Sequence, residues 1–277
     1  MLDETRRILR EHDIKLDRRM NQQQVIDPVF LEKMVDYASL TNEDDVLEIG
    51  AGIGNLTMLL AKRAKTVIAV ERDSRLTKVL RERLRELTNV KLLHGDALRV
   101  EFPRFNKIVS NLPYSISSNV LFKLFRFKFD LAILMFQKEF ATRLVAKPGT
   151  EDYGRLTVNV YYRAETELLD EVPPTAFFPQ PKVSSVIVRL KPRGPPFEVK
   201  DEQLFSNVVR ALFQHRRQRV RNALMHSFSE IFPKKMTTKN ERRLLADEVL
   251  PKKLLEARVM DLVPENFGEI ANLLTFP

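Results

Sequence analysis

Between residues 28 and 145, short apolar runs that suit buried strands alternate with amphipathic runs that suit helices. Strands are expected at 46–50, 66–71, 90–93, 107–110 and 131–136, and helices at 28–39, 55–64, 74–87 and 116–125. Asp27 and Ser74 are expected to cap two of these helices. Because strand–helix–strand crossovers are right-handed, this alternation predicts an α/β, Rossmann-like fold, a mostly parallel sheet flanked by helices.

The chain changes character after this alternation. Two β-rich runs, at 156–164 and 184–190, are expected to extend the sheet, and the stiff segment Pro192-Arg193-Gly194-Pro195-Pro196 follows them. Beyond it the pattern is helical at 201–213, 216–232, 238–249, 252–257 and 264–274. We therefore expect an α/β domain with an N-terminal arm over residues 1–191 and a small all-α domain over residues 192–277.

Three glycines, Gly50, Gly52 and Gly54, stand between the first predicted strand and the following helix. Such a turn lets the backbone approach a ligand closely. A dinucleotide fingerprint needs the spacing G-x-G-x-x-G, whereas this chain has G-x-G-x-G and then Asn55, which disfavours a nicotinamide dehydrogenase. The run VLEIGAGIG resembles the first motif of class I methyltransferases, and this resemblance predicts S-adenosyl-L-methionine as the cofactor.

Two carboxylates follow the next two predicted strands. Glu71 ends the second strand, where it can accept both ribose hydroxyls of the cofactor, and Asp96 follows the third, where it can accept from the cofactor's adenine amine. Because the carboxyl ends of parallel strands meet at one edge of a sheet, Gly50, Gly52, Glu71 and Asp96 are expected to lie together.

The segment Asn111-Leu112-Pro113-Tyr114 follows the fourth predicted strand and resembles the Asn/Asp-Pro-Pro-Tyr/Phe motif of amino-methyltransferases. The side-chain carbonyl of Asn111 and the backbone carbonyl of Leu112 can accept the two hydrogens of an adenine N6 amine. Pro113 fixes the backbone, and Tyr114 can stack on the target base. The motif therefore predicts methyl transfer to an exocyclic adenine nitrogen.

A base inside a duplex cannot reach such a site, so the target must be unpaired or flipped out. Phe177 or Phe178, in the loop AFFPQP, can provide a second aromatic wall opposite Tyr114. The chain has no cysteine, which excludes disulfides, thiolate metal sites and the cysteine nucleophile that a 5-methylcytosine enzyme uses. We expect no metal site.

Longer matches extend this similarity over nearly the whole chain. The segments VLEIGAGIGNLT, VERD, GDAL, NLPYSISS, FQKEFATRLVAKPGTEDYGRL and VPPTAFFPQPKVSSVIVRL resemble those of the KsgA-type ribosomal RNA small subunit adenine dimethyltransferases, and the chain looks like an archaeal member. The resemblance implies dimethylation of N6 of two adjacent adenosines near the 3′ end of small-subunit (16S) rRNA during ribosome biogenesis.

The family also has an N-terminal Gly-Gln-Asn-Phe-Leu motif that touches the cofactor, and here the aligned run is Asn21-Gln22-Gln23-Gln24-Val25. The glutamine is kept at Gln22, while the glycine and the phenylalanine are replaced. The resemblance implies that Gln23 and Val25 contact the cofactor, together with Gly50, Glu71, Asp96 and Asn111.

The formal net charge of +9 favours a polyanionic partner. Arg216, Arg217, Arg219 and Arg221 are expected at the start of a helix, where their guanidinium groups can bind rRNA phosphates. The resemblance implies small-subunit rRNA in a 30S assembly intermediate as the partner. The first ten residues carry both signs of charge and no apolar run. We therefore expect no signal peptide. The sequence also has no long apolar stretch, so we expect no membrane contact. A cytoplasmic protein fits these features and the absence of cysteine, and we further expect a monomer.

Other functions stay open on the sequence. A methyltransferase acting on large-subunit rRNA or on DNA adenine would use the same site chemistry. A ribosome-assembly factor on the same fold is a further alternative, although the complete NLPY segment and both acids favour an enzyme.

Overall fold

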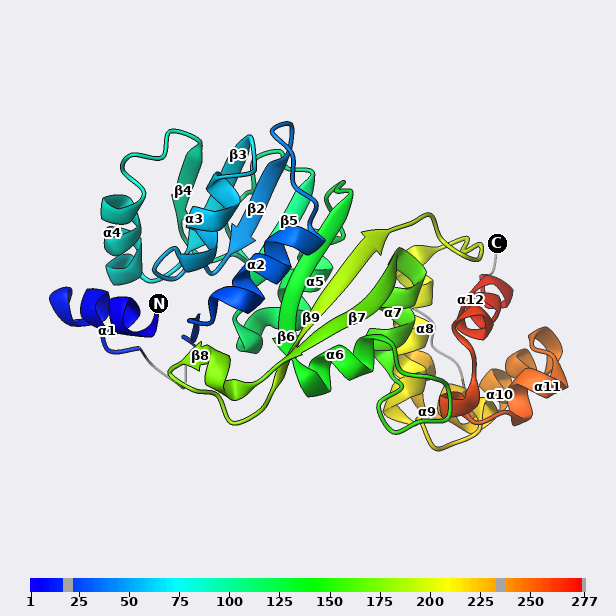
Figure 1. The fold of residues 1–277 in the computed structure, drawn as a ribbon. Helices are drawn as coiled ribbons and strands as arrows, with labels where there is room; N and C mark the ends of the chain where they lie inside the picture. Colours follow the sequence, from blue (N-terminus) through cyan, green and yellow to red (C-terminus); the bar gives the residue numbers. More distant parts are fainter. Residues whose placement is uncertain (17–21, 233–237, 276–277) are drawn as a thin grey trace. The chain divides into compact units, whose positions relative to one another are not determined.

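The computed structural model describes residues 1–16, 22–232 and 238–275, and these form two compact units (Figure 1). The sheet unit comprises Met1–Ala141 and Glu165–Pro192, and the helical unit comprises Thr142–Ala164 and Arg193–Pro277. The chain crosses between the units after Ala141, after Ala164 and after Pro192, and the third crossing lies one residue beyond the boundary expected after residue 191. Residues 142–164, expected in the first domain, pack in the helical unit instead.

A seven-stranded sheet in the order β4-β3-β2-β5-β6-β9-β7 forms the centre of the sheet unit. The strands β4, β3, β2, β5 and β6 run parallel, and β9 pairs antiparallel with β6. The strands are β2 (Asp45–Ile49), β3 (Thr66–Glu71), β4 (Val90–His94), β5 (Lys107–Asn111), β6 (Leu131–Gln137), β7 (Ala164–Val172) and β9 (Ser185–Pro192). The prediction of a mostly parallel α/β sheet is confirmed.

Helices flank this sheet, and a short ladder of β1 (Gln24–Val25) with β8 (Phe177–Phe178) lies beside it (Figure 1). The helices are α1 (Leu2–Glu11), α2 (Pro28–Tyr37), α3 (Asn55–Ala61), α4 (Ser74–Arg83), α5 (Ser117–Leu124) and α6 (Lys138–Leu144), with short 3₁₀ turns at Tyr114–Ile116 and Pro174–Ala176. Asp27 caps α2 as predicted, by accepting from Val29 N. The cap of α4 is Asp73 and not Ser74, because the Asp73 carboxylate accepts from Arg75 N.

The run at 156–164, expected as a strand, folds as helix α7 (Arg155–Arg163), and the strand β7 begins only at Ala164. Its β-branched and aromatic residues favour a strand by propensity. However, Gly154 and Thr157 form a cap in which the threonine hydroxyl accepts from Gly154 N at 3.2 Å. Val158 and Tyr162 are buried in the core of the helical unit, so tertiary packing overrides the local preference.

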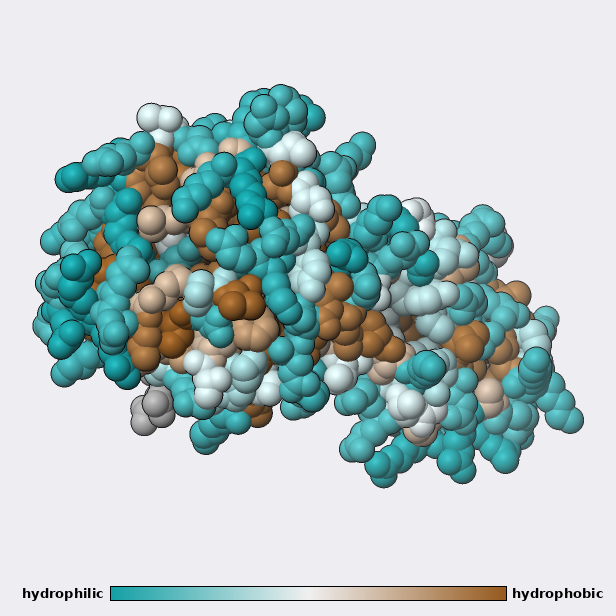
Figure 2. Space-filling model, in the orientation of Figure 1, coloured by the Kyte–Doolittle hydropathy of each residue, from teal (hydrophilic) through white to brown (hydrophobic). Residues whose placement is uncertain are grey.

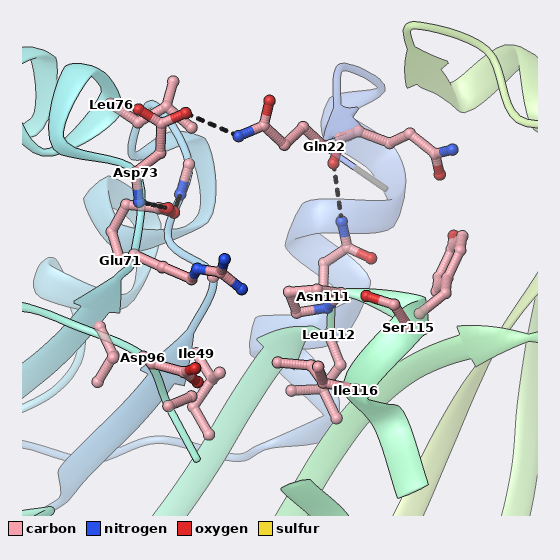
Figure 3. Close-up of a pocket in the computed structure, with 18 of the residues that line it drawn as sticks. Gln22, Ile49, Glu71, Asp73, Leu76, Asp96, Asn111, Leu112, Ser115 and Ile116 are labelled. Carbon is pink, nitrogen blue, oxygen red and sulfur yellow. Dashed lines mark hydrogen bonds between the residues drawn. The ribbon is translucent and has the colours of Figure 1, made fainter. Parts of the chain in front are cut away.

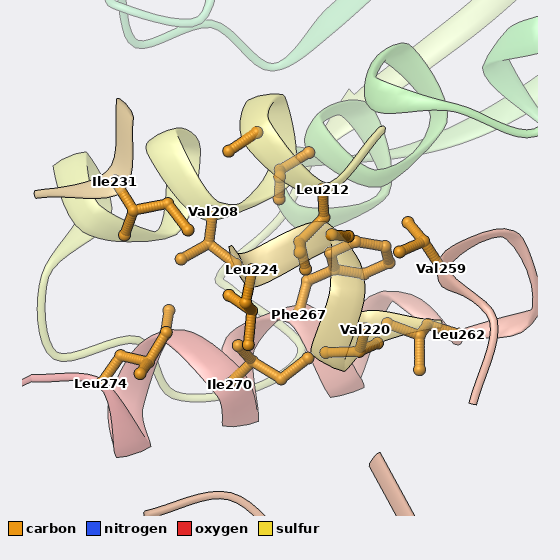
Figure 4. Packing of buried hydrophobic residues seen from close by; sticks show 14 of the residues in the cluster. Val208, Leu212, Val220, Leu224, Ile231, Val259, Leu262, Phe267, Ile270 and Leu274 are labelled. Atoms are coloured by element: carbon orange, nitrogen blue, oxygen red, sulfur yellow. The ribbon is translucent and has the colours of Figure 1, made fainter. Parts of the chain in front are cut away.

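The helical unit closes around its own hydrophobic core, in which Phe205 and Phe267 are fully buried. Side chains from α8, α9 and α12 converge there (Figure 4). Its helices are α7, α8 (Glu202–Gln214), α9 (Val220–Ile231), α10 (Lys239–Val249), α11 (Lys252–Glu256) and α12 (Pro264–Leu273), with a 3₁₀ turn at Val259–Asp261. The predicted helical tail is confirmed.

Hydrophilic side chains cover most of the visible face, with hydrophobic residues showing between them (Figure 2). Within the described residues, every helix is too short or too polar to cross a lipid bilayer.

Candidate active site

A cavity of about 520 Å³ opens where the parallel strands β2, β3, β4 and β5 end. Acidic residues that follow β3 and β4 lie on one side of it, and the residues after β5 lie on the other (Figure 3). The lining residues are Gln22, Gln23, Gln24, Ile49, Gly50, Gly52, Val70, Glu71, Arg72, Asp73, Ser74, Leu76, Gly95, Asp96, Ala97, Asn111, Leu112, Pro113, Tyr114, Ser115 and Ile116. The structure therefore brings together the residues expected from four strand ends.

The glycine turn adopts a backbone that side chains disfavour. Gly50, Gly52 and Gly54 have φ values of +77°, +62° and +90°. A Cβ on Gly52 would lie 2.1 Å from Oε1 of Gln24. Gly52 N instead donates to Glu71 Oε2 at 2.9 Å. The turn is thus packed between the N-terminal arm and the end of β3, with no room for a side chain.

Glu71 is only 8% exposed, and its carboxylate also accepts from Asp73 N at 2.8 Å. Burial raises the pKa of Glu71, and the backbone hydrogen bonds from Asp73 and Gly52 oppose that rise. Each of its oxygens accepts one backbone N–H, which leaves one further lone pair per oxygen. The carboxylate can therefore accept hydroxyls on a ligand without losing its present contacts.

Asp96 lines the same side of the cavity, half-buried, and its Oδ1 accepts from Leu98 N at 2.9 Å. Lys123, on α5, holds the loop that carries Asp96, since its Nζ donates to the carbonyls of Ala97 and Val100 at 2.8 and 2.5 Å. It also lies 4.2 Å from the ring centroid of Phe102. Lys123 is a support that the sequence pattern did not single out.

Asn111 contributes a polar atom with no partner. Its Nδ2 donates to the backbone oxygen of Gln23 at 3.3 Å. A carbonyl can only accept, so this contact fixes the orientation of the amide. Asn111 Oδ1 is then buried with no hydrogen-bond partner among the described residues. Because buried polar atoms are nearly always paired in native structures, an orphan acceptor in a cavity indicates a donor supplied by a ligand.

Leu112 and Pro113 fix the path of the chain after Asn111. Leu112 is 1% exposed, and a Cβ on Gly50 would lie 3.1 Å from the ring of Pro113. The proline therefore packs directly against the glycine turn, which joins the segment after β5 to the segment after β2.

Tyr114 is held by a residue that the sequence analysis missed. Its hydroxyl lies 2.6 Å from Oγ of Ser185, which is fully buried at the start of β9. Burial raises the pKa of Tyr114 to about 12. Ser185 stands in the run PKVSS, 71 positions away in sequence, and only the antiparallel pairing of β9 with β6 brings it beside the site.

Replacing Ser185 with alanine is expected to lower turnover by about tenfold, because the loss of one buried hydrogen bond worth about 1.4 kcal/mol lets the Tyr114 ring turn. Cofactor affinity should stay unchanged. A double-mutant cycle with Tyr114→Phe tests whether Ser185 acts through the hydroxyl of Tyr114. If it does, the double variant should lose no more turnover than either single variant. Additive losses of turnover would show that Ser185 acts elsewhere, and Ser185→Thr should restore part of the rate.

The N-terminal arm crosses the cavity and contacts three of its walls (Figure 3). Gln22 Nε2 donates to Asp73 Oδ2 at 2.8 Å, and Gln24 Oε1 accepts from Ile53 N at 3.2 Å. Gln23 lines the cavity as expected. Asn21 lies outside the described residues.

Two further expectations need correction. Val25 was expected to contact the cofactor, but its side chain is 4% exposed and packs in the core rather than lining the cavity. Phe177 was expected as a stacking wall, yet it is 2% exposed in the same core. Side chains alternate between the two faces of a strand, and Val25 and Phe177 are opposite each other in the β1–β8 ladder. Both side chains therefore point into the same core. Phe178 points elsewhere, into a second hollow beside α1.

The arginine cluster also differs from expectation. The segment 215–218 is a turn, and α9 begins at Val220. Arg216 donates to the carbonyls of Thr150 and Glu151. Arg219 and Arg221 form ion pairs, both with Glu256 and the latter also with Asp247. Only Arg217, among these four, is exposed with no partner within the described residues. Three of the predicted phosphate contacts are therefore already engaged within the helical unit.

Glu48 is a second buried acid that the sequence analysis did not single out. It lies on β2 behind the glycine turn, 2% exposed, and its Oε2 has no hydrogen-bond partner among the described residues. Burial raises the pKa of Glu48 to about 8, and the nearby carboxylate of Glu71 acts in the same direction. Burial therefore favours the protonated form of Glu48 at neutral pH.

Replacing Glu48 with glutamine should raise the free energy of unfolding relative to the wild type progressively as the pH rises from 4.5 towards 8. In this window the native protein keeps a proton that the unfolded chain releases, so the wild type loses stability that the neutral amide keeps. Urea unfolding at both ends of the window checks this. Glu86→Gln, at a side chain 82% exposed, is the control. A pH-independent difference between Glu48→Gln and the wild type would contradict the prediction.

Together, the strand order, the cavity at the carboxyl edge of the sheet and the Asn-Leu-Pro-Tyr segment define a class I methyltransferase. The model of the family described as "Ribosomal RNA adenine dimethylase" matches residues 14–263. The chain belongs to this family of adenine dimethyltransferases.

Similar proteins agree with this placement. The "Probable ribosomal RNA small subunit methyltransferase A" of Methanosarcina acetivorans is 46% identical over 97% of this chain and 97% of its own length. The protein of the same name from Methanothermobacter thermautotrophicus is 46% identical over 97% and 94%. A solved dimethyladenosine transferase from Plasmodium falciparum has a TM-score of 0.73 at 30% identity, over 87% of this chain and 93% of that chain. The 23S rRNA methyltransferase ErmE has a TM-score of 0.65 at 28% identity, over 90% and 98%.

Proposed function

We propose that the protein transfers methyl groups from S-adenosyl-L-methionine to N6 of two adjacent adenosines near the 3′ end of small-subunit rRNA. The observation that carries the proposal is the buried, unpartnered Asn111 Oδ1 inside the cavity. An exocyclic amine is the donor that such an acceptor suits. The names of the archaeal relatives support the choice of small-subunit rRNA as the substrate.

The cofactor fits the donors and acceptors on the acidic side of the cavity. The spare lone pairs of Glu71 can accept the ribose hydroxyls, and Asp96 can accept from the adenine amine. Gln23 and the backbone of the glycine turn can border the methionine part. When bound, the sulfonium supplies an electrophilic methyl group.

The residues after β5 would prepare the nucleophile. The lone pair of an adenine N6 amine is delocalised into the ring. Hydrogen bonds from the amine to Asn111 Oδ1 and to the Leu112 carbonyl favour a more tetrahedral nitrogen whose lone pair faces the methyl donor. Tyr114, fixed by Ser185, stacks on the base. Alignment and electrostatics then provide most of the rate acceleration, without a covalent intermediate.

The substrate is an RNA whose target adenosines are flipped out or unpaired. The net charge of +9 and the exposed Arg217 support contact with its phosphates. We further propose that the protein acts as a cytoplasmic monomer on a 30S assembly intermediate.

The test is incubation with labelled cofactor and unmethylated small subunits, followed by mapping of N6,N6-dimethyladenosine. Label in two adjacent adenosines near the 3′ end is expected. Large subunits and DNA are parallel arms, because ErmE shares the fold and its printed name is that of a 23S rRNA enzyme. Label confined to large subunits or to DNA would overturn the choice of substrate.

A further inference from the structure

A second hollow, of about 550 Å³, is lined by residues of α1 and of the segment at Phe178 and Pro179. It has no lining residue in common with the cofactor cavity. Its walls come from α1, from the residues just after it, and from the loop at Pro179. The lining residues are Asp3, Arg6, Leu9, Arg10, Ile14, Lys15, Leu16, Phe178 and Pro179.

The floor of this hollow is apolar and its rim is basic. Leu9 and Ile14 are buried, and Phe178 packs against their cluster. The guanidinium of Arg6 lies over the Phe178 ring, 5.4 Å from its centroid. Arg10 and Lys15 are exposed on the rim. An aromatic ring next to a planar cation gives a nucleobase two surfaces to stack on, and the rim suits phosphate.

The basic side chains of the rim have few acidic neighbours in the lining of the hollow. No ion pair involves Arg6, Arg10 or Lys15 among the described residues, and Asp3 is the one acid in the lining. By contrast, Arg7, which lies on the same helix but does not line the hollow, is 3.8 Å from Glu11. Positive charge therefore accumulates on the side of α1 that lines the hollow.

The hollow is joined to the catalytic cavity through the β1–β8 ladder. Phe178, in the hollow, pairs with Gln24, which lines the cavity. The preceding residue, Gln23, accepts from the Asn111 amide. A nucleic-acid strand that places one base at Asn111 thus has a basic and aromatic hollow on the other side of this two-stranded ladder.

We propose that this hollow binds an unpaired nucleotide of the RNA substrate outside the target base. Its base packs against Phe178 and Arg6, and its phosphate contacts Arg10 and Lys15. The inference rests on the proposed function for the identity of the RNA. It gives Phe178 a role in holding the strand rather than in sandwiching the methylated base.

The test compares Arg10→Glu with Arg7→Glu, an identical charge change on the same helix. The probe is an unmethylated small-subunit rRNA fragment that contains both target adenosines, titrated against the full chain with cofactor bound. Arg10→Glu should weaken RNA binding by about tenfold and reduce its salt dependence, because a phosphate contact is lost. Arg7→Glu should bind as the wild type does. Phe178→Leu should also weaken binding, Phe178→Tyr should not, and all four variants should keep the wild-type cofactor affinity.

Equal RNA affinities for Arg10→Glu and Arg7→Glu would overturn the inference. So would a loss with Arg10→Glu that is seen for intact subunits and not for the rRNA fragment, which would assign the hollow to a protein of the subunit. Methylation by the wild type is measured separately. If the wild type methylates small subunits and the two variants bind alike, the inference alone fails. If the wild type methylates no adenosine, the proposed function fails. The comparison of RNA affinities then still shows whether the hollow binds RNA.

Discussion

Replacing Asn111 with alanine is expected to lower turnover by about 10²–10³-fold, the usual effect of removing one preorganised polar group from an active site. The substitution removes the buried Oδ1 that awaits the substrate amine, and with it the alignment of the nitrogen. Cofactor affinity should change little, because Glu71 and Asp96 lie on the other side of the cavity (Figure 3). Single-turnover methylation of unmethylated small subunits, with a separate titration of the cofactor, checks both parts.

Asn111→Asp is the matched control. It keeps an acceptor at the same place but loses the Nδ2 donor to Gln23 O, so it should retain more activity than the alanine variant. Normal turnover by Asn111→Ala would show that the orphan acceptor is not catalytic. A parallel loss of cofactor affinity would instead assign Asn111 to the cofactor site.

The parts of this site that could be predicted from sequence are those set by strand ends. Glu71 and Asn111 end parallel strands, Gly50 and Asp96 come shortly after such strands, and the carboxyl ends of parallel strands meet at one edge of the sheet. Their residue types were informative because the cofactor and an amine substrate need acceptors there. No knowledge of side-chain packing was required to place them together.

The residues that could not be predicted depend on long-range contacts. Ser185 reaches Tyr114 through the pairing of the last strand, and Lys123 supports Asp96 from a helix on another crossover. Neither contact leaves a local pattern in the sequence. The ion pairs of Arg219 and Arg221 are also formed across the helical unit, so a run of arginines could not reveal how many are free.

The same limit applies to secondary structure. The run at 156–164 has a composition typical of strands, but residues 155–163 form a helix because the apolar residues among them are buried in the helical unit. The cap formed by Gly154 and Thr157 favours a helix start at this position, and composition alone does not reveal it.

Replacing Gly52 with alanine should weaken cofactor binding by roughly 100-fold, a combined loss of about 3 kcal/mol. Gly52 has a φ of +62°, which costs an alanine roughly 1–2 kcal/mol. Its new Cβ would meet Oε1 of Gln24 at 2.1 Å, so the glutamine must move and Ile53 N loses its acceptor. Calorimetric titration with the cofactor measures the loss.

Gly149→Ala is the control for the effect of backbone strain on stability. Gly149 has a φ of +83°, and a Cβ there would meet no atom closer than 3.6 Å. This control carries the backbone strain without the collision, and it lies in the helical unit, outside the cavity. Both variants should lose thermal stability, whereas Gly52→Ala alone should lose the cofactor. If Gly52→Ala binds cofactor as tightly as Gly149→Ala does, the arm is free to withdraw from the glycine turn, and Gln24 is not part of a closed binding site.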